Sequence, residues 1–184
     1  MKFSELAAQR YSVRRFDSRP VEQDVLDQIL ETGRLAPTAK NLQPQRIYVV
    51  RSEVLLAKLR AITAMTFDAP PVLILCADPS EAWVNPFNGR SSAEMDASIV
   101  AAHMMLQMQE LGIGSTWVCW FDTEKVKQAL ALPESVEPYC LLPFGYPSAV
   151  PGNMISASRW IRQCAISNSI LSLRRSEAQC LLIF

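Results

Sequence analysis

The sequence predicts a domain of the α/β or α+β class, in which helices and strands alternate along the chain. Apolar residues recur with helical spacing across Val21–Gly33, whereas Pro71–Ala77 is an unbroken apolar run that suits a strand covered on both faces. Ala93–Leu111 is apolar almost all round and predicts a buried helix, either in the core or in a subunit interface. With 184 residues, the chain is most simply one domain.

The first half of the chain is expected to run helix, loop, strand, helix, strand. The first of these helices ends at Gly33, a natural C-cap, and the loop Ala36–Pro44 leads to a β-branched strand at Ile47–Val50. Ser52 can cap the helix that follows, before the apolar strand over 71–77.

The second half begins with a turn-rich surface excursion over Pro79–Arg90. Ser91–Glu94 has the pattern of a capping box and opens the long apolar helix. The later elements are expected at Ser115–Cys119 (strand), from a Thr123 cap to about Leu132 (helix) and at Tyr139–Phe144 (strand).

The composition excludes several classes of protein. Eighteen basic residues balance eighteen acidic ones, which supports neither nucleic-acid binding nor a polybasic membrane contact. The first residues lack the apolar core of a signal peptide, and no charge-free run of about 18 apolar residues predicts a membrane span. The five cysteines are odd in number and form no C-x-x-C pair, so we expect reduced thiols in a cytoplasmic protein and no zinc site.

The N-terminal run from Arg10 places three guanidinium groups and a hydroxyl within six residues, which is the chemistry of a phosphate clamp. In an extended segment Arg10, Ser12 and Arg14 share one face and Arg15 points the other way, because side chains alternate. Tyr11 can add a backbone amide. A solvated basic terminus explains the spacing equally well.

The loop Ala36–Pro44 combines a helix breaker, small residues and amides, which suits close contact with the polar edge of a flavin ring. Taken alone, an ordinary connection from helix to strand is the better explanation. The residues concerned are Pro37 as the breaker, Thr38 and Ala39 as the small residues, and Asn41 and Gln43 as the amides.

The remaining signals indicate a cofactor in place of a side-chain catalyst. Gly112–Thr116 closes a helix and precedes a strand, so it is not a dinucleotide-binding turn, and its first glycine is better explained as a C-cap with positive φ. Trp117 and Trp120 either pave a ring or belong to the core and its rim. His103 is expected in the core and Cys119 as a buried structural thiol. The absence of hydrolase and P-loop motifs fits an enzyme whose cofactor performs the chemistry.

Four segments, in order and spacing, resemble the FMN-dependent nitroreductase family. The resemblance covers about Phe3 to Pro147. The segments are Arg10–Arg14 (RYSVR), Ala36–Pro44 (APTAKNLQP), Asp96–Val100 running into Glu110–Trp117, and Leu142–Pro147 (LPFGYP).

This resemblance implies an α+β fold, with a central, mostly antiparallel sheet flanked by helices, in an intertwined homodimer that holds FMN at its interface. A backbone N–H near Cys119 or Trp120 would serve the flavin N5, and no catalytic side chain or metal is expected. The implied cofactor-binding residues are Arg10, Tyr11, Ser12 and Arg14 at the phosphate and ribityl end, Pro37, Thr38, Ala39, Asn41 and Gln43 at the flavin of the other subunit, and Trp117, Val118, Cys119 and Trp120 along the ring.

The implied activity is an oxidoreductase that passes a hydride from NADH or NADPH through FMN to a small electron-poor acceptor, such as a nitroaromatic, quinone or enone, by a ping-pong mechanism. The alternative is an FMN-binding carrier or inactive flavoprotein without turnover. A flavin-dependent dehydrogenase or dehalogenase on the same fold is a third interpretation, decided by lid residues around Trp83–Arg90 and Trp120.

Two departures from the family pattern stand out. Residues 1–148 form the nitroreductase-like domain, but 149–184 contain no Lys or Asp and no longer match, so we hypothesise a diverged or frame-shifted tail. An intact in-frame codon pattern through Phe184 would contradict this. If the tail is native, Arg159 or Arg162 replaces the phosphate ligand that this region often supplies. Gln45 stands where an aromatic residue often follows Gln-Pro, which opens the pocket above the ring.

Overall fold

A four-stranded antiparallel sheet organises residues 2–148, the part of the chain that this computed structural model describes. The atypical tail expected over 149–184 lies outside the described residues. In spatial order the strands are β1 (Gln45–Val50), β2 (Val72–Ala77), β4 (Glu137–Gly145) and β3 (Gly114–Ser115), each antiparallel to its neighbour. The α+β class and the antiparallel sheet that the resemblance implies are confirmed.

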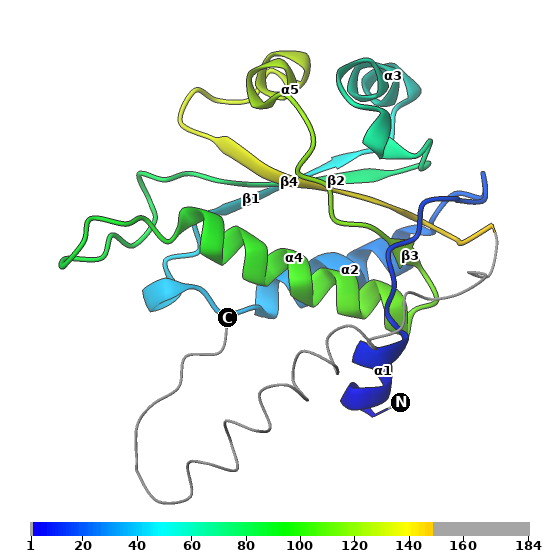
Figure 1. Cartoon of the computed structure of the whole chain (residues 1–184), viewed down its shortest axis with the longest axis horizontal. Coiled ribbons are helices and arrows are strands. Elements are labelled where there is room, and N and C mark those ends of the chain that lie inside the picture. The colour runs from blue at the N-terminus through cyan, green and yellow to red at the C-terminus, as the bar shows by residue number, and fades with distance from the viewer. Residues whose placement is uncertain (1, 149–184) are drawn as a thin grey trace, which may run out of the picture. The chain divides into compact units, whose positions relative to one another are not determined.

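Helices cover both faces of this sheet, as Figure 1 shows. One face carries α3 (Glu53–Ile62) and α5 (Thr123–Leu130), and the other carries α2 (Gln23–Leu35) and α4 (Ala93–Glu110). The shorter elements are α1 (Phe3–Gln9), η1 (Ala39–Asn41) and η2 (Ala64–Thr66).

Strand β2 is buried on both faces because its side chains alternate between two cores. Leu73 and Leu75 join the core under α2 and α4, whereas Val72, Ile74 and Cys76 join the core under α3 and α5. The unbroken apolar run in the sequence is therefore explained by burial from two sides, as predicted.

Gly33 lies inside helix α2, which continues to Leu35, so its predicted role as a C-cap is wrong. It is buried against α4 instead. A Cβ at this position would lie 2.9 Å from the Sδ of Met104 and 3.4 Å from a methyl carbon of Val100. Close approach of two helices, and not turn chemistry, explains the glycine.

The start residues of two helices also differ from the prediction. Ser92 is the N-cap of α4, and its hydroxyl donates to Asp96 at 2.7 Å in place of the capping box expected from Ser91. Asp122 caps α5 with its side chain, and Thr123 is the first helical residue. In α5, therefore, an acidic side chain takes the capping role predicted for a hydroxyl.

The strand expected at Ser115–Cys119 is shorter than predicted. Strand β3 comprises only Gly114–Ser115, and one further bridge joins Val118 to Leu141. Gly112 ends α4 with a φ of 73°, which confirms the predicted positive φ.

Helix α4 is buried on one face only. Val100, Ala101 and Met104 are fully buried, but Met95 is 64% exposed and Ala102 is exposed. The same helix carries half-buried His103, whose Nδ1 lies 2.8 Å from the carbonyl oxygen of Ile99, so the expected core position of this histidine is wrong. Since the helix is apolar on both faces, its open face is unusual for a surface.

Candidate cofactor-binding site

The segment after α1 runs alongside β3 and places Arg10 and Ser12. Ser12 forms a parallel bridge with Ser115, and the N–H of Val13 donates to the Ser115 carbonyl at 3.0 Å. A Cβ on Gly114 would lie 2.5 Å from Cγ2 of Val13, so only glycine allows this approach. The second glycine of the rejected dinucleotide pattern therefore has a packing role.

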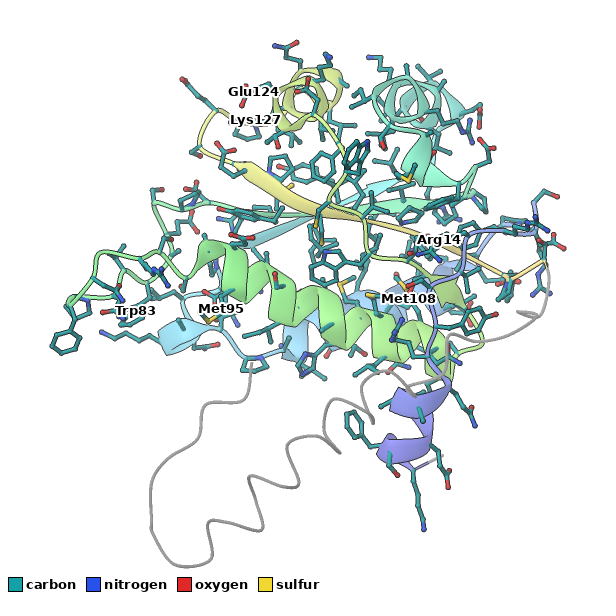
Figure 2. The ribbon with its side chains drawn as sticks, viewed as in Figure 1. Arg14, Trp83, Met95, Met108, Glu124 and Lys127 are labelled. Atoms are coloured by element: carbon teal, nitrogen blue, oxygen red, sulfur yellow. The ribbon has the colours of Figure 1, made fainter. Side chains whose placement is uncertain are left out.

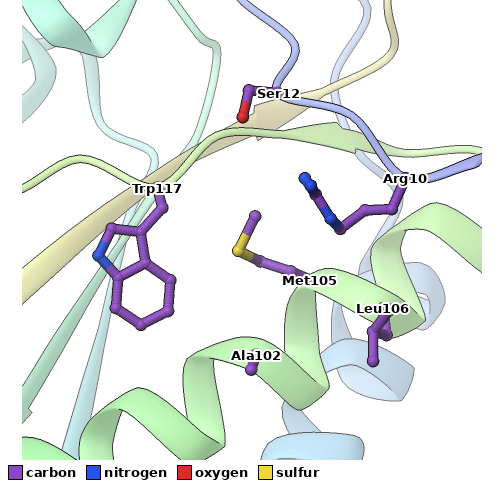
Figure 3. Close-up of a pocket in the computed structure, with 6 residues that line it drawn as sticks. All are labelled: Arg10, Ser12, Ala102, Met105, Leu106 and Trp117. Atoms are coloured by element: carbon purple, nitrogen blue, oxygen red, sulfur yellow. The ribbon is translucent and has the colours of Figure 1, made fainter. Parts of the chain in front are cut away.

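A pocket of about 370 Å³ lies between this segment and helix α4 (Figure 3). The N-terminal segment supplies the polar groups, α4 supplies an apolar floor, and a tryptophan from the segment after β3 stands across from them. Such a pocket suits a ligand with an anionic end and a flat apolar part. Its lining residues are Arg10, Ser12, Ala102, Met105, Leu106 and Trp117.

The polar groups of the pocket are free to bind a ligand. Within residues 2–148, neither the guanidinium of Arg10 nor the hydroxyl of Ser12 has a hydrogen-bond or ion-pair partner; only the Ser12 carbonyl is used, by Arg14 at 3.5 Å. A guanidinium and a hydroxyl together can donate several hydrogen bonds to one phosphate group.

Arg14 is not brought to this pocket. Its guanidinium lies 5.9 Å from the ring centroid of Phe67, on an exposed side chain. The pocket lining thus includes Arg10 and Ser12 but not Arg14, whose guanidinium donates to the Ser12 carbonyl at 3.5 Å. The face that alternation predicts these three residues to share stays a prediction. Tyr11 is half-buried and Arg15 is exposed. A role for Arg14 or Tyr11 at the cofactor stays a prediction.

The loop predicted to meet the flavin ring lies against the first turn of α4. The N–H of Ala39 donates to Oδ1 of Asp96 at 2.8 Å. Inside the loop, the N–H of Gln43 donates to the Thr38 hydroxyl and the Gln43 amide donates to Oδ1 of Asn41, both at 3.2 Å. One hydrogen bond to α4 and two within the loop therefore hold its shape.

The loop backbone is strained. Lys40, Asn41 and Gln43 have φ values of 51°, 55° and 53°, in the left-handed region that favours glycine. Pro37, Asn41 and Gln43 are exposed. Residues held in sparsely populated backbone regions concentrate at functional sites, where the surrounding contacts enforce them.

Asp78 secures the far end of this loop. Its N–H donates to the Pro44 carbonyl at 2.9 Å, and its carboxylate accepts the hydroxyls of Ser80 and Ser135 at 2.6 and 2.7 Å. These hydroxyl bonds, that of Ser80 first, lower the pKa of Asp78 from its ordinary value.

The loop and the pocket are separate patches within one chain. The loop contacts α4 at Asp96 and the pocket contacts it at Met105, about 14 Å further along the helix axis. In Figure 2, Trp83 and Met95 mark the loop end of α4, and Met108 marks the other end.

The segment after β3 gives one clear pocket residue. Trp117 lines the pocket, and its indole N–H donates to Sγ of Cys119 at 3.1 Å. Cys119 is exposed, so its predicted burial is wrong. Val118 is buried in the core under α3 and α5, and its backbone N–H and carbonyl both pair with Leu141. Its contact with a cofactor stays a prediction that these paired groups do not favour.

Trp120 lies at the surface with 81% of its area exposed, and its carbonyl accepts the Thr63 hydroxyl at 2.6 Å. In the part of the chain that the structure describes, the backbone N–H groups of Cys119 and Trp120 have no acceptor. They remain available to a ligand, as the resemblance implies.

The sequence gives no direct signal for the pocket floor. Ala102, Met105 and Leu106 share one side of α4, but a helix that is apolar all round does not reveal which side stays open. Asp96 was also missed as a site residue; an acid within an apolar helix is the signal that could have found it.

Two further classes of site can be addressed over residues 2–148. No group of three or more His, Cys, Asp or Glu side chains is placed to hold a metal ion. No helix in this range has the length and apolar character needed to cross a membrane.

An antiparallel sheet between helix pairs, with a polar-rimmed pocket on one helix, defines an α+β protein with a candidate ligand pocket. The model of the nitroreductase family matches residues 7–72 and 61–146. The chain therefore belongs to the nitroreductase family, and the predicted nitroreductase-type oxidoreductase is confirmed.

Individual relatives agree with this assignment. A solved nitroreductase family protein from Clostridium difficile 630 is 40% identical with a TM-score of 0.80, covering 83% of this chain and 88% of that one. An NADH dehydrogenase from Thermus thermophilus is 31% identical over 77% of this chain and 85% of its own length. An FMN-dependent nitroreductase from Clostridium difficile R20291 shares the fold at 24% identity and TM-score 0.69, over 96% and 98% of the two chains.

Proposed function

We propose that this protein is an FMN-dependent oxidoreductase that takes a hydride from NADH or NADPH and delivers it to a small electron-poor acceptor. The observation that carries the proposal is that the guanidinium of Arg10 and the hydroxyl of Ser12, at the rim of an apolar pocket, have no partner among residues 2–148. A phosphate on a flat ring system satisfies both halves of that pocket, whereas a purely apolar or purely anionic ligand satisfies only one.

The chain's own residues would bind and orient the cofactor. Arg10 and Ser12 would hold the phosphate, and the floor formed by Met105 and neighbouring α4 residues would keep water from one side. The N–H groups of Cys119 and Trp120, which have no acceptor within the described range, would donate to the ring and stabilise negative charge there. When bound, FMN supplies the hydride chemistry, accepting from the nicotinamide and then giving to an acceptor such as a nitroaromatic, quinone or enone.

The same proposal includes a homodimer. The open face of α4 carries exposed Met95 and Ala102, with Ile99 and Leu106 half-buried, and a second copy would cover this apolar stripe. Because the loop and the pocket lie toward opposite ends of α4, an antiparallel partner helix would bring the loop of one subunit to the pocket of the other. Sedimentation velocity tests this: a dimer that Met95→Glu weakens, with loss of flavin, is expected. A wild-type monomer that retains flavin would contradict it.

The absorbance spectrum of the purified protein tests the function. We expect a yellow protein that NADH or NADPH bleaches without oxygen and that a quinone or nitroaromatic restores. Parallel lines in double-reciprocal plots with both substrates varied would support the ping-pong order. Yellow protein that neither nicotinamide reduces favours a carrier, and protein that takes up no added FMN would contradict both interpretations.

A further inference from the structure

Asp96 is a buried carboxylate with no role in the proposed activity as described so far. It lies in the first turn of α4 and is only 1% exposed. No Lys, Arg or His of residues 2–148 forms an ion pair with it. Burying a carboxylate is costly unless its oxygens are hydrogen-bonded, so its bonds indicate why it is there.

Each oxygen of Asp96 has its own donor. Oδ1 accepts the N–H of Ala39 at 2.8 Å, from a loop 57 residues earlier in the chain, and Oδ2 accepts the hydroxyl of Ser92 at 2.7 Å. The position near the helix N-terminus also favours a negative charge. The Ser92 bond is local to the helix start, whereas the Ala39 bond joins two distant segments.

The hydrogen bond from Ala39 to Asp96 lies immediately before the strained part of the loop. The three left-handed residues Lys40, Asn41 and Gln43 follow directly, and such positions persist only where surrounding contacts enforce them. The other hydrogen bonds are inside the loop, such as that from Gln43 to Thr38, or at its far end, where Asp78 donates to Pro44 and Arg46 donates to the Gln43 carbonyl at 3.4 Å. Among residues 2–148, Asp96 alone connects the first half of the loop to the body of the domain through a charged acceptor.

We propose that Asp96 is a positioning residue for the cofactor: it holds the loop Thr38–Gln43 in the strained shape that presents Asn41 and Gln43 to the flavin ring. This inference rests on the proposed function. A role limited to starting helix α4 would instead run through Ser92, and the two bonds of Asp96 allow these roles to be separated.

The experiment compares Asp96→Ala with Ser92→Ala. The Ser92→Ala variant keeps the hydrogen bond from Ala39 to Asp96 and loses the one from the Ser92 hydroxyl. FMN affinity is measured by flavin fluorescence titration of the apoprotein, and loop order by amide hydrogen exchange of the same apoprotein without flavin. We expect Asp96→Ala to weaken FMN binding about 10- to 100-fold, the effect of losing a hydrogen bond to a charged group. It should also speed exchange over 38–43, and Ser92→Ala should do neither.

Two further variants complete the design. Asp96→Asn keeps an oxygen for the Ala39 N–H, and the Ser92 hydroxyl can accept from the new amide, so it should recover most of the affinity and the visible circular dichroism of bound FMN. Glu94→Gln, an exposed carboxylate of the same turn, should match the wild type. If Asp96→Ala does not fold, Asp96→Asn replaces it in the exchange measurement: its neutral oxygen is a weaker acceptor, so it should exchange faster than wild type at Ala39, whereas Ser92→Ala should not.

The outcomes separate this inference from the proposed function. Unchanged FMN affinity in folded Asp96→Ala overturns the inference, whether or not exchange accelerates. An equal loss in Ser92→Ala also overturns it and reduces Asp96 to a helix-start residue. Wild-type protein that takes up no FMN removes the proposed function and the flavin role together, while the exchange measurement still shows whether Asp96 holds the loop.

Discussion

The two ends of helix α4 carry two chemically opposite halves of the candidate site. Near Met105 the polar groups of Arg10 and Ser12 have no partner in the described range and face a pocket. Near Asp96 the loop has most of its polar groups already bonded and its backbone strained. The half near Met105, called the open half below, offers donors to an anionic group. The half near Asp96, called the closed half, offers a loop whose shape is already fixed.

The two ends of α4 therefore contribute differently to cofactor binding: one through bonds to the phosphate, the other through the shape of the loop. Free donors at the surface cost little to maintain and gain strength when a phosphate binds them. A strained loop costs on the order of 1–3 kcal/mol for each unusual residue, so its shape must be held before the ligand arrives. We therefore expect side-chain variants at the open half to change FMN affinity directly, through lost bonds to the phosphate, and variants at the closed half to change it indirectly, through the shape of the loop.

The largest expected effect is at the open half. Arg10→Ala should weaken FMN binding about 100-fold, because it removes charge-assisted bonds to a phosphate. Arg15→Ala, on an exposed side chain outside the pocket, is the control and should bind normally. Arg14→Ala should have a smaller effect than Arg10→Ala, given its position over Phe67. Flavin titration measures all three, and an equal loss in Arg14→Ala would show that this side chain turns to the cofactor.

The next effect concerns how the open half is built. Gly114→Ala should destabilise the protein by about 2–3 kcal/mol, since the new Cβ would lie 2.5 Å from Val13. Adding Val13→Ala should recover part of this loss. Gly33→Ala is the control, because the flexible end of Met104 can move and alanine favours a helix, and it should stay within about 1 kcal/mol of wild type. Urea unfolding measures each value; equal costs for both glycines would contradict the packing argument.

A smaller effect should appear at the closed half on acidification. The pKa of Asp78 is lowered in the folded state, so its contribution to stability is complete above the unfolded value of about 3.9 and is lost as the pH falls through the folded value. The melting temperature of wild type should exceed that of Asp78→Asn at pH 6, and the gap should narrow toward pH 3. A gap that stays constant with pH would count against the role of this carboxylate.

The smallest perturbation is chemical labelling of the thiols. Burial raises the pKa of Cys76 to about 12, which leaves roughly one thiolate in ten thousand at pH 8. Burial also raises the pKa of Cys140, whereas Cys119 is exposed beside Trp117. Alkylation mapped by mass spectrometry should therefore modify Cys119 long before the other two. Bound FMN should slow this reaction, and an equal rate with and without FMN would place Cys119 away from the cofactor.

Some elements were predictable because their cause is local. The apolar run of β2 and the positive φ of Gly112 both follow from neighbouring residues, and both are confirmed. Gly33 shows the opposite case: its helical context resembles a C-cap, but its cause is the contact with Met104 in another helix. Cys119 was likewise predicted at the end of a strand and buried, yet the strand ends at Ser115 and Cys119 is exposed.

The sequence by itself determined the family, because motif order and residue type can be read along the chain, and through the family it determined the α+β class, which hydrophobic periodicity alone left open against α/β. Only the tertiary structure decided that Arg10 and Ser12 meet Trp117 while Arg14 lies over Phe67. It also decided that Asp96 reaches Ala39, 57 residues away in the chain. Such contacts depend on how packed elements bring distant segments together, and no spacing within one segment encodes them.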